Sequence, residues 1–199
     1  MGAGVPFVGL TGGMGAGKSV ALEILARLGA ATLSTDSVVH EIYEDPEVIA
    51  LVVERWGEQV APDGVVDRSA IAAAAFASPD ERAWLEQLVW PRVAQRVGAF
   101  REEALAADPP PRAAIVETPL LFEAGMDGVY DATIAVVADE AVRAERAATR
   151  GHASADERAA RQLPQDEKAR RATFAVHNDG TVQELEAELS EVLGKLEAT

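Results

Sequence analysis

The sequence predicts an α/β fold in which helices cover a parallel sheet. Three observations support this prediction. Short apolar runs alternate with helical patterns, the first of these runs ends in a cluster of glycines, and a single helical pattern separates the first two runs. Strand, helix and strand at this spacing form a unit whose two strands are parallel.

The N-terminal part of the sheet begins with residues 6–11, an apolar run that predicts a buried strand. Apolar residues at helical spacing predict a helix over 19–28, which ends at Gly29. Residues 30–34 predict a second strand that leads into Asp36.

The middle of the chain, from 37 to 107, has mostly helical patterns. The sequence Ser78-Pro79-Asp80 predicts the start of a helix within it. Three consecutive prolines at 109–111 form a stiff linker. This linker is the clearest break in composition along the chain.

The C-terminal part of the chain supplies the remaining strands. They are predicted over 113–117, 133–137 and, more weakly, 174–176. Helices are predicted over 140–149, 155–163 and 182–196.

Composition excludes several classes of protein. The 199 residues include no cysteine, which excludes a disulfide scaffold, a thiolate zinc site and a cysteine nucleophile. The formal net charge of -15 argues against nucleic-acid binding and against docking on an anionic membrane. With no apolar run long enough to span a membrane and no basic, apolar leader, we expect a cytoplasmic protein.

Residues 12–19 read GGMGAGKS and fit the pattern G-x-x-x-x-G-K-[ST]. The motif lies between a predicted strand and a predicted helix, which is the structural context of a phosphate-binding loop. Its backbone N–H groups can surround phosphates, Lys18 can reach the β- and γ-phosphates, and Ser19 can ligate Mg²⁺. We therefore expect a nucleoside triphosphate to bind here. The residues expected at that site are Gly13, Gly15, Ala16, Gly17, Lys18, Ser19 and Val20.

Other sequence features narrow the class of nucleotide-binding protein. The tetrapeptide N-K-x-D of GTPases does not occur, and the chain is shorter than most ATPase motors. An acid just after the second strand and an arginine-rich segment near the end favour a small-molecule kinase. Asp36 can accept a proton from an acceptor hydroxyl, although it can also act as a helix cap.

The arginine-rich segment spans 143–171 and holds eight basic and five acidic side chains. Arg143, Arg146 and Arg150 share one helix face by their spacing. One interpretation is a lid whose arginines neutralise charge on the transferring phosphoryl group. The alternative is a solvated helix with ion pairs along it.

The sequence resembles the dephospho-coenzyme A kinase family over nearly the whole chain. The glycine-rich opening is similar, and the Pro-Leu-Leu-Phe-Glu run at 119–123 is the most telling match. Other matching positions are Asp67 with Arg68, Trp90 to Val93, and Arg146 with Arg150.

The resemblance implies transfer of the ATP γ-phosphoryl group to the ribose 3′-hydroxyl of dephospho-CoA, with Mg²⁺. It implies a three-layer P-loop kinase fold with a five-stranded parallel sheet, a helical substrate-binding insertion and a lid. The expected parts are a core at about 1–36, 112–142 and 172–199, an insertion at about 37–111 and a lid at about 143–171.

The resemblance also implies roles for individual residues. Asp36 would be the base, with Lys18 and Arg146 as further catalytic residues and Ser19 as the Mg²⁺ ligand. Arg146, Arg150 and Asn178 would join the ATP site, Asn178 in a loop near the adenine. The acceptor side would consist of Asp36, His40, Arg68, Arg92, Pro119, Leu120 and Glu123.

Two departures from the family pattern keep alternatives open. Ser34 stands where the family usually has an aspartate, and Trp90 stands where it has a histidine. Trp90 either stacks on substrate or fills a core. The alternatives are a P-loop kinase for another nucleoside or nucleotide, and a nucleotide-binding protein without transfer activity.

Overall fold

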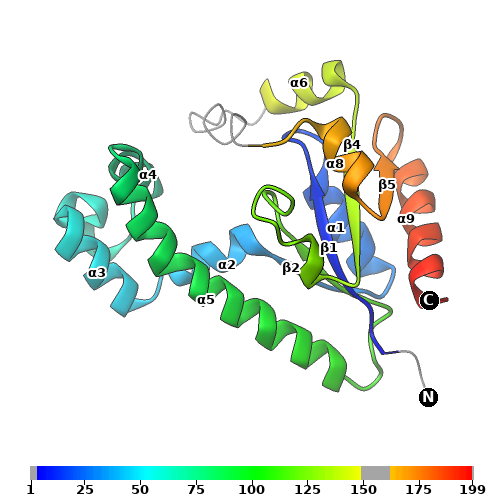
Figure 1. Cartoon of the computed structure of the whole chain (residues 1–199), viewed down its shortest axis with the longest axis horizontal. Helices are drawn as coiled ribbons and strands as arrows, with labels where there is room; N and C mark the ends of the chain where they lie inside the picture. The colour runs from blue at the N-terminus through cyan, green and yellow to red at the C-terminus, as the bar shows by residue number, and fades with distance from the viewer. Residues whose placement is uncertain (1–3, 149–161, 199) are drawn as a thin grey trace. The chain divides into compact units, whose positions relative to one another are not determined.

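The computed structural model describes residues 4–148 and 162–198 and contains one five-stranded sheet. All its strands are parallel, in the order β2-β3-β1-β4-β5 (Figure 1). The strands are β1 (Phe7–Gly12), β2 (Ala31–Ser34), β3 (Ala114–Glu117), β4 (Ala132–Val137) and β5 (Phe174–His177).

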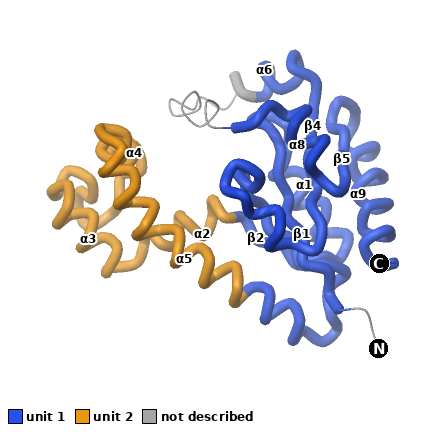
Figure 2. Tube along the Cα trace, in the orientation of Figure 1, with its two compact units in different colours: residues 1–34, 100–199 blue, residues 35–99 orange. Residues whose placement is uncertain are grey.

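The chain forms two compact units (Figure 2). The first consists of the described residues of 1–34 and 100–199 and holds the sheet, and the second is 35–99. The helices of the first unit are α1 (Lys18–Arg27), α6 (Glu140–Ala148), α8 (Gln165–Arg171), α9 (Val182–Glu197) and the short η3 (Asp127–Val129). The second unit contains α2 (Thr35–Ile42), α3 (Pro46–Trp56), η1 (Glu58–Val60), η2 (Pro62–Gly64) and α4 (Arg68–Phe76), and α5 (Pro79–Ala106) runs from it into the first.

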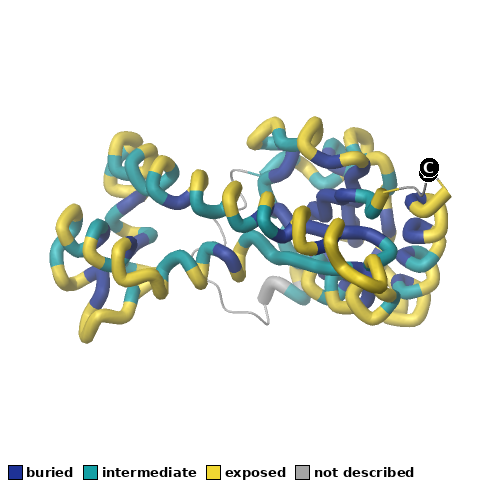
Figure 3. The backbone as a smooth tube through the Cα atoms, turned by 90° about the horizontal axis from the view of Figure 1, so that it is seen from below, coloured by how far each residue is buried: buried dark blue, intermediate teal, exposed yellow. Residues whose placement is uncertain are grey.

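One face of the sheet packs against α1 and α9. The three central strands, β1, β3 and β4, are buried over their full length (Figure 3). Alternate β1 residues, Val8 and Leu10, share a core with Ile24 of α1 and Leu189 of α9. Since successive strand residues point to opposite faces, the other β1 residues must face a different layer.

That second layer consists of the segment after β3, the C-terminal end of α5 and α8. A Cβ added at Gly9 would lie 2.4 Å from Leu121 Cδ1 and 2.7 Å from the Tyr130 ring, so this segment touches the strand backbone. The guanidinium of Arg101, in α5, lies 4.8 Å from the centre of the Phe7 ring. The sheet is therefore the middle of three layers.

The second unit has a small core of its own. Val48 and Val52 of α3 pack there with Ile71 of α4. The rings of Trp56 and Trp84 meet edge to face with centroids 5.0 Å apart. This unit therefore holds its helices together by packing among its own residues.

The predicted fold is confirmed, and all five predicted strands are present. The Ser78-Pro79-Asp80 signal is also confirmed, because α5 begins at Pro79 and Ser78 Oγ accepts from the Glu81 amide at 3.2 Å. Among the described residues, no helix is both long and apolar enough to cross a membrane.

The expected boundaries of the parts differ from the compact units. The insertion was expected at 37–111, but the second unit is 35–99, because Phe100 and Ala104 are buried in the first unit. The expected lid includes α8, which packs on β4, β1 and β5. Residues 149–161, which include most of the helix predicted over 155–163, lie outside the described residues. The lid itself stays a prediction.

Candidate active site

The glycine loop connects the carboxyl end of β1 to α1 at the centre of the sheet. Gly15 and Gly17 have φ of 74° and 93°, a region that side chains disfavour. In the described structure no side chain caps the start of α1, and its first turn holds no acidic residue. Its first N–H groups are thus left for an anion, which the helix dipole also attracts.

The basic and hydroxyl groups of the motif start this helix. Lys18 is its first residue, and its Nζ donates to the carbonyl of Gly13 at 3.3 Å, so the ammonium lies over the loop. Ser19 follows and is exposed, while Val20 is half-buried against the core. Loop amides, an ammonium and a hydroxyl are therefore close together.

Asn178 bonds to the backbone of the glycine loop. Its Nδ2 donates to the buried carbonyl of Ala16 at 2.8 Å, and a Cβ on Gly17 would lie 2.1 Å from the same nitrogen. Arg146 Nη1 donates to the Asn178 carbonyl at 3.0 Å. The structure thus connects the loop after β5, the glycine loop and Arg146, one of the predicted lid arginines. Arg150 lies outside the described residues.

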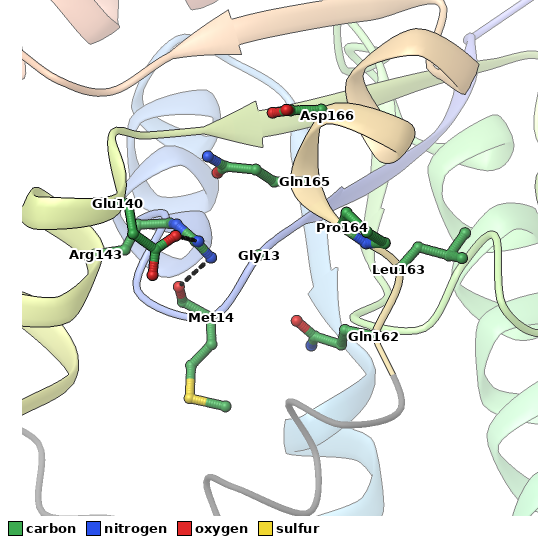
Figure 4. Close-up of a pocket in the computed structure, with 9 residues that line it drawn as sticks. All are labelled: Gly13, Met14, Glu140, Arg143, Gln162, Leu163, Pro164, Gln165 and Asp166. Carbon is green, nitrogen blue, oxygen red and sulfur yellow. Dashed lines mark hydrogen bonds and ion pairs between the residues drawn. The ribbon is translucent and has the colours of Figure 1, made fainter.

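A cavity of about 450 Å³ opens beside the glycine loop (Figure 4). Arg143 lies along it and donates to the carbonyl of Met14 at 3.5 Å, and its guanidinium also pairs with Glu140. The cavity is lined by Gly13, Met14, Glu140, Arg143, Gln162, Leu163, Pro164, Gln165 and Asp166. Arg143 therefore packs against the loop rather than extending into solvent.

The cavity wall opposite the loop is fixed to the sheet by Gln165. Its side-chain amide donates to the carbonyl of Ala138 at 2.7 Å and accepts from the amide of the same residue at 3.2 Å. Ala138 directly follows β4, so this pair of bonds fixes the start of α8 at the carboxyl end of that strand.

The predicted acceptor segment, 119–123, lies against the strand that leads into the loop. Thr11 Oγ1 of β1 donates to the Pro119 carbonyl at 3.3 Å, and the Thr118 amide donates to Leu10 O at 2.8 Å. Pro119 and Leu120 are half-buried. The segment and the glycine loop therefore start from neighbouring strand ends, where ligands bind in open parallel sheets.

Glu123 and Lys168 form an ion pair beneath this segment. Lys168 Nζ lies 3.0 Å from Glu123 Oε1, and its side chain is completely buried. Burial lowers the pKa of Lys168, while the hydrogen bond and charge of Glu123 raise it. No sequence pattern predicted a site role for Lys168.

The departure at Ser34 has a local partner. Ser34 Oγ donates to Glu117 Oε2 at 2.7 Å, and the two residues are paired in register at the carboxyl ends of β2 and β3. Because Glu117 is buried, its carboxylate needs hydrogen-bond donors, and the Ser34 hydroxyl is one of them.

The remaining predicted acceptor residues lie in the second unit. Asp36 is exposed in the first turn of α2, and His40 of the same helix pairs with Glu44 at 3.7 Å. Arg68 is exposed at the start of α4. Arg92 of α5 donates to the Leu88 carbonyl at 2.9 Å.

Trp90 does not fill a core. It is 57% exposed, so the interpretation that Trp90 fills a core is wrong. Its neighbour on α5, Val89, is 6% exposed and takes the buried position instead.

Comparison with known proteins shows similarity along most of the chain. The family model described as Dephospho-CoA kinase matches residues 6–184. The dephospho-CoA kinase of Deinococcus radiodurans is 37% identical over 195 residues, which cover 96% of this chain and 93% of that protein.

Solved structures show the same fold. The crystal structure of TT1252 from Thermus thermophilus superposes with a TM-score of 0.78 at 31% identity, covering 97% of this chain and 98% of that one. A dephospho-CoA kinase from Campylobacter jejuni superposes with a TM-score of 0.65 at 19% identity, covering 98% of each chain. By the family match along most of its length, this chain belongs to the dephospho-CoA kinase family.

Proposed function

We propose that this chain transfers the γ-phosphoryl group of ATP to the ribose 3′-hydroxyl of dephospho-CoA, giving CoA and ADP. The observation that carries the proposal is the hydrogen bond between Thr11 Oγ1 and the Pro119 carbonyl. It holds the family's most telling segment, 119–123, against the strand that leads into the glycine loop.

The groups of the first unit supply phosphate binding. The N–H groups of the glycine loop and of the first turn of α1 surround the phosphates, and Lys18 neutralises charge that develops on them. The exposed hydroxyl of Ser19 is a hard oxygen donor, which suits Mg²⁺ held jointly with phosphate oxygens. When bound, Mg²⁺ would supply further charge neutralisation at those oxygens.

Asp36 is the proposed base. It follows the carboxyl end of β2 by two residues, and its carboxylate takes the proton of the acceptor hydroxyl as that oxygen attacks the γ-phosphorus. The bond from the γ-phosphorus to the bridging oxygen breaks, and ADP leaves with the electron pair. His40, Arg68 and Arg92 are proposed to bind the acceptor from the same unit.

Arg146 is proposed to stabilise the transferring group. Its guanidinium is held at 3.0 Å by the Asn178 carbonyl beside the loop. Arginine placed in this way neutralises charge in phosphoryl-transfer transition states. We propose that Arg150 acts with it.

The direct test is to incubate the chain with ATP, Mg²⁺ and dephospho-CoA and to measure CoA by mass. Adenosine and AMP serve as competing acceptors in parallel reactions. Formation of CoA in preference to the other products supports the proposal. Bound ATP with no CoA formed would refute it, and phosphorylation of another acceptor would show a different kinase specificity.

Asp36→Asn tests the proposed base. The substitution removes proton acceptance while keeping side-chain size, so kcat should fall by about 10²–10⁴-fold with ATP affinity unchanged. Asp63→Asn is the matched control, since Asp63 is also an exposed aspartate of the second unit. Near-normal turnover by Asp36→Asn would show that another group takes the proton.

A further inference from the structure

Lys168 is a buried cation whose position no binding role yet explains. Its side chain is 0% exposed, in a helix where the other long basic residues, Arg170 and Arg171, are exposed. Burying an ammonium is costly unless each of its protons finds an acceptor. The surroundings of Nζ therefore indicate what the residue holds in place.

Among the residues that the structure describes, three oxygens lie close to Lys168 Nζ, one for each of its protons. The Pro119 carbonyl lies at 2.6 Å, Glu123 Oε1 at 3.0 Å and Thr11 Oγ1 at 3.4 Å. Two of these oxygens belong to the segment 119–123, and the third belongs to β1. The ammonium therefore joins the two ends of that segment to the strand that precedes the glycine loop.

Glu123 extends the connection to the cavity. Its Oε1 also accepts from the Leu163 amide at 2.7 Å, and Leu163 lines the cavity together with Gly13. Its other oxygen, Oε2, is buried. The carboxylate thus faces the interior and is shared between the buried lysine and the cavity wall.

We propose that Lys168 is a positioning residue that fixes the Pro119 carbonyl, and with it the segment 119–123, for binding of the acceptor. The inference rests on the proposed function, because that function makes the segment part of the acceptor site. Without the ammonium, the 3.3 Å bond from Thr11 is the one hydrogen bond that the described residues still give the Pro119 carbonyl. The segment then loses the 2.6 Å hydrogen bond from Lys168, although its own sequence is unchanged at Pro119.

A purely structural role predicts a different outcome. Replacing a buried ion pair by uncharged groups of similar volume is often neutral or stabilising, whereas removing one partner leaves a buried charge. The decisive variant therefore neutralises both partners. Lys168→Met with Glu123→Gln does this, and the glutamine keeps an oxygen that can accept from the Leu163 amide.

Two further variants make the comparison specific. Glu123→Gln alone measures what the carboxylate itself contributes, since Lys168 can still reach Pro119. Arg112→Met with Glu197→Gln removes a bidentate ion pair with N–O distances of 2.6 and 2.8 Å. The two side chains of this pair are 34% and 43% exposed, and the pair touches neither the glycine loop nor the segment 119–123. It controls for the loss of an ion pair as such.

Steady-state kinetics give the first measurement. Relative to Glu123→Gln, the double variant should raise KM for dephospho-CoA by about tenfold or more, the loss expected for one charge-assisted hydrogen bond. Its kcat and its affinity for ATP should stay within about twofold. An unchanged KM for dephospho-CoA, with or without lower stability to urea, would overturn the proposal.

Hydrogen exchange gives a second measurement that needs no substrate. The Ala124 and Met126 amides bond to the Leu120 and Leu121 carbonyls within the segment's turn. In the double variant these two amides should exchange about tenfold faster than in the wild type. In the variant with Arg112→Met and Glu197→Gln, the same two amides should exchange at the wild-type rate. Unchanged exchange would overturn the positioning role. Absence of CoA from the wild-type reaction would instead refute the proposed function, with the exchange result still deciding whether Lys168 fixes the segment.

Discussion

The bond from Asn178 to Ala16 allows a quantitative prediction about the glycine loop. Asn178→Ala removes the donor at 2.8 Å and leaves the Ala16 carbonyl buried without it. A buried acceptor left unsatisfied costs about 1–3 kcal/mol, so the free energy of unfolding should fall by that amount. Urea unfolding followed by far-ultraviolet circular dichroism measures the loss.

The same variant should weaken ATP binding. The Asn178 amide packs directly on Gly17, whose left-handed conformation sets the start of α1. With this support removed, part of the binding energy must be spent on ordering the loop. If about 1.4 kcal/mol is spent in this way, Kd for ATP rises about tenfold. Titration with a fluorescent ATP analogue measures the change without requiring any acceptor.

Thr181→Ala is the matched control for this prediction. Thr181 forms the capping box of α9, with its Oγ1 accepting from the Glu184 amide at 3.2 Å, and its loss should cost about 0.5–2 kcal/mol. The two variants thus lose similar stability, but only Asn178 bonds to the loop. If Asn178→Ala binds ATP as the wild type does, or if Thr181→Ala weakens binding equally, the reasoning is refuted.

Three further predictions address phosphate binding, pH dependence and packing. Lys18→Ala removes a charge-assisted contact to phosphate, so kcat/KM for ATP should fall about 10- to 100-fold, and an unaffected rate would exclude the role. Burial raises the pKa of Tyr130 above its usual value of 10.0, against a lowering by its bond with Thr118. The folded state therefore favours the neutral phenol, and the stability this gives is complete below pH 10.0 and disappears as pH rises through the folded pKa. Urea unfolding between about pH 8 and 11 should show this loss in the wild type, and Tyr130→Phe should reduce it; equal slopes would contradict the assignment. Gly9→Ala places a Cβ 2.4 Å from buried Leu121 and should lower the free energy of unfolding by about 1–3 kcal/mol in the same assay. Unchanged stability would mean that the segment after β3 can shift to accept the added methyl group.

The parts of the fold that sequence predicted best are those specified by local patterns. The strand predicted over 6–11 is Phe7–Gly12, and the helix predicted over 182–196 is Val182–Glu197. Buried parallel strands are continuous apolar runs, and α9 has apolar residues at regular helical spacing. The place of the glycine loop between a strand and a helix was equally predictable, because its motif consists of neighbouring residues in the chain.

What sequence missed depends on contacts between distant segments. The short helix α8 carries mostly charged residues, so nothing local indicates that Lys168 is buried. Its partner, Glu123, belongs to another segment, and only the fold brings the two together. The one available signal was the Pro-Leu-Leu-Phe-Glu run, whose acidic end follows four apolar residues and so needs a cation if it is buried.

The difference between the expected insertion, 37–111, and the second unit, 35–99, has a related cause. The helix α5 runs unbroken from Pro79 to Ala106, so its pattern gives no sign of where one packing environment ends and the next begins. Burial of Phe100 assigns its last turns to the first unit. The prolines at 109–111 mark the end of the helix rather than the end of the unit.

The partnership of Ala16 with Asn178 also constrains when the glycine loop can be completed during synthesis. The two residues are 162 positions apart, a separation that takes roughly 8–30 s to translate at about 5–20 residues per second. Throughout that interval the nascent loop lacks the amide that holds its carbonyl. We therefore expect a chain truncated before Asn178 to carry the entire phosphate-binding motif yet to bind ATP more weakly than the full chain does.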